Sequence, residues 1–159
     1  MKVILPMRSV VAHTAAAVTS LVFLFASVPK LLDPGGFAAD LQNYRVLPDA
    51  LVGHAALYVP AFELAVALAL LFPRYQRGAA LLATLLLVVF AGAMAQARVR
   101  GIDLSCGCFG AAFESKVSWW TVTRSGLLAL VAAIPLRWPP LSAAAAQPLT
   151  SRQRRTRVA

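Results

Sequence analysis

Charged side chains are scarce in this sequence, and acidic ones are the scarcest. Only 13% of its 159 residues are Asp, Glu, Lys or Arg, whereas 60% are hydrophobic. A soluble domain has about 25% charged and about 45–50% apolar residues, so these values exclude an ordinary soluble domain and a disordered chain. Cysteine is also rare, and two cysteines are too few to staple a secreted disulfide scaffold. The length fits one domain.

Long apolar runs, by contrast, are frequent. Crossing a bilayer takes roughly 20 mostly apolar residues in a helix. Four stretches satisfy this length, at about residues 10–31, 51–72, 78–97 and 117–136. They predict an all-α fold, an integral membrane four-helix bundle that occupies residues 1–137. The first run follows Lys2 and Arg8 and can also be read as a signal peptide, but we expect an uncleaved helix because a signal-peptide core has only about 7–15 apolar residues.

The connections between the four runs differ in length. Residues 33–50 begin with Asp33-Pro34-Gly35-Gly36, which predicts a turn-rich loop, and residues 73–77 predict a tight turn. Residues 98–116 form a second long loop, which contains both cysteines. Residues 138–159 continue from Trp-Pro-Pro into alanines and arginines without apolar periodicity, so we predict a disordered basic tail.

The distribution of basic residues predicts the orientation in the membrane. With four spans, both termini and the short turn share one side, which carries nine basic residues and no acidic one. The other side carries five basic residues and five acidic ones: Lys30, Arg45, Arg98, Arg100, Lys116, Asp33, Asp40, Asp49, Asp103 and Glu114. The positive-inside rule therefore predicts cytoplasmic termini, in a multi-pass protein of the cytoplasmic membrane with both long loops outside. The net charge of +9 is then a topology signal, and we expect no nucleic-acid partner.

Cys106 and Cys108 are the candidate catalytic residues, separated only by Gly107. A disulfide between them would close a small, strained ring, and strained disulfides are easily reduced and tend to be catalytic or regulatory. The predicted outer location also permits thiol–disulfide chemistry. Two buried unpaired thiols or a passive disulfide are the alternatives. Metal binding ranks lower, because the outer loops offer only His54 as a further soft ligand and structural zinc takes four.

Two charged residues, Glu63 and Arg124, fall inside the predicted spans. Charges at that depth are costly and usually pair, so we expect a Glu63–Arg124 ion pair that is either structural or part of a proton relay or quinone contact. Lys30, at the outer end of the first span, is expected to snorkel to the interface. Trp119 and Trp120 open the fourth span and fit an interfacial aromatic belt, with stacking on a quinone ring as the alternative.

Several motifs resemble the MauE-type members of the DoxX-like membrane proteins. The resemblance covers roughly residues 20–136. It is carried by Pro29-Lys30-Leu31-Leu32-Asp33-Pro34 with Phe37, Tyr44-Arg45-Val46-Leu47-Pro48, Tyr58-Val59-Pro60-Ala61-Phe62-Glu63-Leu64, Gly101-Ile102-Asp103, Cys106-Gly107-Cys108-Phe109-Gly110 and Arg124. The resemblance implies four membrane helices. It also implies a part in maturing a disulfide-rich exported protein beside a thioredoxin-like partner, as in methylamine utilisation.

These observations favour a membrane thiol–disulfide oxidoreductase that works with a thioredoxin-like protein, an exported client or a quinone. Four-helix disulfide oxidases of the DsbB-like and VKOR-like kind relay electrons through a second cysteine pair, which this chain lacks. Two other classes of function remain open. A non-enzymatic assembly factor would not depend on the cysteines, and a small transporter would depend on Glu63 and Arg124 instead.

Overall fold

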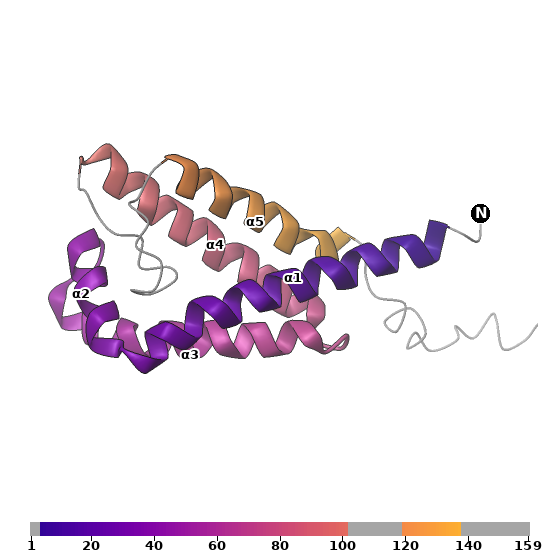
Figure 1. Cartoon of the computed structure of the whole chain (residues 1–159), viewed down its shortest axis with the longest axis horizontal. Helices are drawn as coiled ribbons and strands as arrows, with labels where there is room; N and C mark the ends of the chain where they lie inside the picture. The colour runs from indigo at the N-terminus through magenta and orange to yellow at the C-terminus, as the bar shows by residue number, and fades with distance from the viewer. Residues whose placement is uncertain (1–3, 102–118, 138–159) are drawn as a thin grey trace, which may run out of the picture.

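The computed structural model describes residues 4–101 and 119–137, and both parts are helical throughout apart from short connections (Figure 1). The helices are α1 (Ile4–Leu32), α2 (Pro34–Tyr44), α3 (Asp49–Leu71), α4 (Gln76–Val99) and α5 (Trp119–Arg137). The predicted all-α class is therefore confirmed. The cysteine pair and the predicted tail lie outside the described residues.

Four of these helices are long and apolar enough to cross a membrane: α1, α3, α4 and α5. Within the membrane-length window of each, at most 33% of the residues are buried inside the protein. The remaining apolar side chains face outward, where lipid is the medium that favours them. The protein is thus a multi-pass membrane protein with the four spans expected, each within a few residues of its predicted bounds.

Successive membrane helices run in opposite directions, as Figure 1 shows. α1 packs against α3, α4 packs against α5, and contacts of α1 with α5 and of α3 with α4 close the bundle. The tight turn predicted at residues 73–77 is present, with the backbone N–H of Tyr75 donating to the carbonyl of Phe72 at 3.0 Å. α2, the end of α4 and the start of α5 consequently share one end of the bundle.

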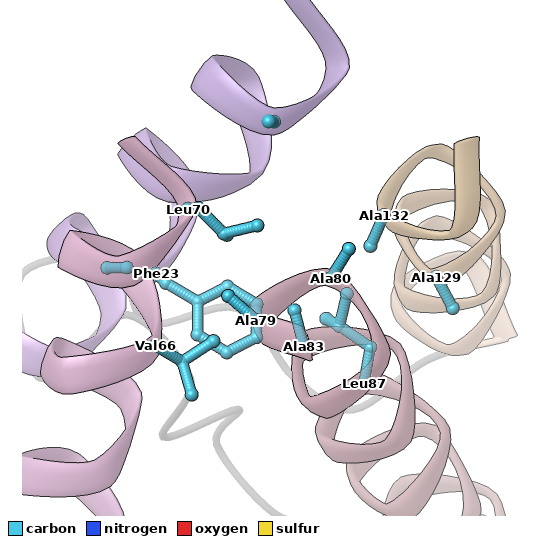
Figure 2. Close-up of a cluster of buried hydrophobic side chains, with 11 residues drawn as sticks. Phe23, Val66, Leu70, Ala79, Ala80, Ala83, Leu87, Ala129 and Ala132 are labelled. Carbon is cyan, nitrogen blue, oxygen red and sulfur yellow. The ribbon is translucent and has the colours of Figure 1, made fainter. Parts of the chain in front are cut away.

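Small side chains hold the core together. Figure 2 shows alanines of α4 facing alanines of α5, with Phe23, Val66 and Leu70 beside them. Because lipid tails are as apolar as leucine, membrane helices gain mainly from close packing, which small residues permit. We call the α4–α5 contact the alanine seam, and its members are Ala79, Ala80, Ala83, Ala129 and Ala132.

The prediction of a loop at residues 33–50 is wrong, because most of this segment forms the helix α2. Asp33 caps this helix by accepting a hydrogen bond from the backbone N–H of Gly36 at 2.9 Å, and Pro34 occupies the first turn, where its missing N–H costs nothing. Arg45, with φ of 49°, ends the helix in the left-handed conformation. The turn-forming residues at 33–36 therefore start a helix that packs on α3 rather than a loop.

Candidate functional site

A buried ion pair between α1 and α3 is the centre of the candidate site. Lys30 Nζ lies 2.8 Å from Oε1 and 2.9 Å from Oε2 of Glu63, so the ammonium donates to both carboxylate oxygens. The two residues are only 4% and 2% exposed. Buried charges are tolerated when they are paired and hydrogen-bonded, and this pair meets both conditions.

Two sequence-based expectations are corrected here. Lys30 does not snorkel to the interface but points into the bundle, because Glu63 lies within hydrogen-bonding distance. The ion pair of Glu63 is accordingly with Lys30, whereas Arg124 had been expected to provide it. The spacing of charges along the sequence gives their approximate depths, which favoured Arg124, but it does not give the direction in which each side chain points.

Arg124 nevertheless belongs to the same place. A small cavity of about 40 Å³ has Lys30, Glu63, Arg124 and Ser125 in its wall, together with side chains from all four membrane helices. A polar cavity can hold ordered water once it offers about 10–15 Å³ to water centres. We call Lys30, Glu63 and Arg124 the charged cluster. The three intramembrane polar residues singled out from the sequence are thus brought together.

Two phenylalanines flank the ammonium group. Lys30 Nζ lies 5.0 Å from the ring centroid of Phe37 on α2 and 5.2 Å from that of Phe90 on α4. A cation within about 6 Å of an aromatic face is attracted by the ring quadrupole. The rings therefore add to the stabilisation of the ammonium, while Glu63 neutralises its charge.

A larger cavity lies under α2, on the other side of Lys30 and Phe90. Its volume is about 300 Å³, and nearly all of its surface is apolar. Lys30, Asp40 and side chains of three helices line it: Phe37, Leu41 and Tyr44 from α2, Ala55 and Val59 from α3, and Val89, Phe90, Ala93 and Met94 from α4. We call it the α2 cavity. Its surface is almost wholly apolar, although Lys30 and Asp40 are among the residues around it.

Asp40 of α2 is the acidic residue beside the α2 cavity. Partial burial raises the pKa of Asp40 from its usual value of 3.8, the nearby Asp33 raises it further, and Lys30 acts in the opposite direction. Burial raises the pKa of a carboxyl group because it disfavours the charged form. The folded protein therefore favours the neutral carboxyl at this position more than the unfolded chain does.

The remaining candidate residues lie apart from the charged cluster. Trp119 and Trp120 begin α5 and are 59% and 72% exposed, as an interfacial belt requires. Neither tryptophan lines the small cavity or the α2 cavity. His54 lies on an exposed face of α3 and stacks on Tyr58, with ring centroids 6.5 Å apart. Cys106 and Cys108 lie outside the described residues, so their catalytic assignment stays a prediction.

Sequence reasoning missed the α2 cavity and the part of Phe90 in it. One signal was present for α2: Phe37, Leu41 and Tyr44 follow one another at the i, i+4, i+7 spacing of an amphipathic helix, directly after an Asp-Pro start. The two glycines at positions 35 and 36 obscured it. Phe90 carried no signal, because it is one apolar residue among many in α4.

Comparison with known proteins supports one family. The family described as "Methylamine utilisation protein MauE" matches residues 7–137. A methylamine utilization protein MauE from Paracoccus denitrificans is 38% identical over 114 residues, which cover 71% of this chain and 61% of that relative's length. One from Methylophilus methylotrophus is 35% identical over 132 residues, covering 79% of this chain and 70% of the relative. No solved structure matches. The match spans all four membrane helices, and the chain belongs to the MauE family of membrane proteins.

Proposed function

We propose that the protein is a membrane thiol–disulfide redox protein that supports disulfide formation or maturation of exported proteins. Cys106 and Cys108 are its reactive pair, and a thioredoxin-like protein or an exported client is its partner. The reactive groups are the two thiols of this chain. Methylamine utilisation, for which the relatives are named, is one setting in which such a protein acts.

The observation that carries this proposal is the position of the two helix ends that flank residues 102–118. α4 ends and α5 begins at the bundle end where α2 lies (Figure 1). The same end holds Lys30 and the α2 cavity. The segment that carries the cysteines is therefore attached beside the one buried polar site formed by the described residues of several helices.

The compartment follows from charge. Nine basic residues without an acid lie on the side of the termini, and the positive-inside rule assigns that side to the cytoplasm. The cysteine segment then lies outside, where disulfides persist. A membrane-impermeant maleimide should label the thiols in intact cells after mild reduction, and labelling only after lysis would contradict the proposed topology.

Disulfide exchange requires a thiolate that attacks a disulfide sulfur through a mixed disulfide. In the direction of client oxidation, a client thiolate attacks the Cys106–Cys108 disulfide, and the client's second thiol resolves the adduct. The client becomes a disulfide, and the pair becomes a dithiol. A quinone then accepts two electrons and two protons from that dithiol, which restores the disulfide and yields a quinol.

Trapping of the mixed disulfide tests the proposal. Exchange is reversible, and in the reverse direction a thiolate of the reduced pair attacks the disulfide of an oxidised partner, while the second cysteine resolves the mixed disulfide. We assign Cys106 as the attacking residue in that direction, because it follows the polar Asp103-Leu104-Ser105 while Cys108 precedes Phe109, and shielding in apolar surroundings raises the pKa of a thiol. Cys108→Ser should accumulate a covalent partner adduct on non-reducing gels, and Cys106→Ser should accumulate much less. If neither variant traps a partner and both retain function, the cysteines are passive and the protein is an assembly factor.

A further inference from the structure

We infer that α2 is a lid over the α2 cavity and that Lys30 of the buried ion pair holds this lid in place through Phe37. The lid lies on one side of the cavity, and its anchor belongs to the charged cluster. The inference goes beyond the proposed redox function and does not depend on the cysteines. It names the contact that links the buried charges to the position of a surface helix.

α2 is too short to be stable by itself. It has 11 residues, whereas isolated helices shorter than about 12–15 residues are marginal in water, and Gly35 and Gly36 in its first turn weaken it further. The helix therefore exists because it packs on the bundle. Segments with few buried contacts open locally at a low cost in free energy, so the contacts of α2 decide how often it opens.

Phe37 is the one buried residue of α2. It is 8% exposed, whereas Leu41 and Tyr44 on the same side of the helix are only partly buried. These two residues line the α2 cavity, so part of the surface beneath them is space rather than packed side chains. The attachment of α2 to the bundle thus depends most on Phe37.

Phe37 meets the ammonium group of Lys30. The Nζ atom lies 5.0 Å from the ring centroid, within the distance of about 6 Å at which an aromatic face attracts a cation. This attraction is strongest where water is excluded, and both residues are buried. Nζ is fixed in turn by its two hydrogen bonds to Glu63 of α3 and by the ring of Phe90 on α4. Lys30 therefore joins α2 to three membrane helices through one charged group.

The chain has a short joint at each end of α2. Asp33 alone separates α2 from α1, and Arg45 ends α2 in the left-handed conformation before α3 begins at Asp49. Figure 1 shows α2 at an angle to the membrane helices, at one end of the bundle. A few residues at the ends of an element can absorb the backbone change of a hinge. Loss of the Lys30 contact should therefore free α2 without unfolding the membrane helices.

Hydrogen exchange of the α2 amides tests this inference in the purified full-length chain in lipid nanodiscs, with detection by mass spectrometry. Phe37→Leu keeps an apolar side chain but removes the ring face that attracts the ammonium. It should speed exchange across α2 about tenfold, because the lid opens more often. Phe23→Leu makes the same change in the apolar core and should leave α2 exchange within about twofold. Equal effects of the two variants on α2 would overturn the anchor.

The charge of Lys30 needs a separate test, because Phe37→Leu also changes the shape of the side chain. The paired variant Lys30→Leu/Glu63→Leu removes both charges together and should also speed α2 exchange about tenfold. In this background Phe37→Leu should add less than about twofold, since the ring has no ammonium left to attract. If Phe37→Leu has the same effect in both backgrounds, Phe37 acts through packing alone and the inference fails.

Trifluorophenylalanine at position 37 covers the case in which the charge-free variant does not fold. Fluorination keeps the shape of the ring but withdraws electron density from its face, so α2 exchange should become several-fold faster. Exchange as slow as in the wild type would overturn the role of the ammonium. No thiol takes part in these measurements, so a failed trapping experiment would overturn only the proposed function, and a failed exchange experiment only the lid.

Discussion

The two ends of the bundle are held together by opposite means. Near the α3–α4 turn, the alanine seam packs α4 on α5 through small apolar side chains (Figure 2). At the other end, helices are separated by two cavities and joined by the charged cluster and by α2. The seam stabilises the bundle through apolar contacts, whereas the charged end has less close packing because it contains buried polar groups and cavities.

This difference indicates which end carries function. Buried charges in a membrane are costly and persist mainly where they pair or line a path or a site. A purely structural bundle could be packed with small residues along its whole length, as the seam is. One interhelical hydrogen bond, from Ser20 Oγ to the carbonyl of Ala67 at 2.8 Å, adds to the apolar contacts between α1 and α3.

The largest expected effect concerns the ion pair. Lys30→Met or Glu63→Leu alone leaves one buried charge without its partner and should lower stability by about 3–5 kcal/mol, whereas the double variant should be much less affected. Thermal unfolding in detergent, monitored by size-exclusion chromatography, measures the three variants. A second double-mutant cycle, with Arg124→Gln and Glu63→Leu, should give a smaller coupling energy than the cycle of Lys30 and Glu63. Simple additivity of Lys30→Met and Glu63→Leu would contradict the pairing.

Overpacking the apolar core near the α3–α4 turn should destabilise the protein less than breaking the ion pair does. Ala67 is fully buried among the core residues of α3, and Ala67→Leu should destabilise by about 1–3 kcal/mol because a larger side chain forces the helices apart. Ala65→Leu, two residues earlier and on the exposed face, is the matched control and should be close to neutral. The same thermal assay compares them. Equal effects would mean that close packing is not what holds this end.

The start of α2 offers a smaller and more local change. A Cβ at Gly36 would collide with the Asp33 carboxylate that caps the helix, whereas a Cβ at Gly35 makes only ordinary contact at 3.6 Å. Gly36→Ala should therefore lose the cap and lower stability by about 0.5–2 kcal/mol. Gly35→Ala should be neutral or stabilising, since alanine is the better helix former. Gly36→Ala should therefore unfold at a lower temperature than Gly35→Ala, and the opposite order would contradict the role of the Asp33 cap.

The smallest effect is the pH dependence of Asp40. Because its pKa is raised in the folded protein, its stabilising contribution is present below the usual value of 3.8 and is lost as the pH rises through the folded-state pKa. Asp40→Asn removes this loss. The variant should gain slightly in unfolding temperature relative to wild type as the pH increases above about 4, and then stay level. A difference that is the same at every pH would contradict burial as the cause.

The class of the protein follows from its amino-acid sequence alone. Four apolar runs of membrane length can only be satisfied as helices, because every backbone polar group in lipid must be bonded within its own segment. Their number and approximate bounds, and the choice of Glu63 and Arg124 as intramembrane charges, followed from composition and depth alone. The motifs of the chain also pointed to the family that the comparisons support.

Which charges pair and where the cavities form depends instead on how the helices pack together. Depth along the spans favoured Arg124 as the partner of Glu63, but in the folded bundle the side chain of Lys30 turns inward and makes the ion pair. The conversion of residues 34–44 from an expected loop into a helix depended on the apolar face that α3 and α4 present to Phe37, Leu41 and Tyr44. Helix rotation and the cavity under α2 arise from packing between segments far apart in the chain, and local sequence patterns do not encode such packing.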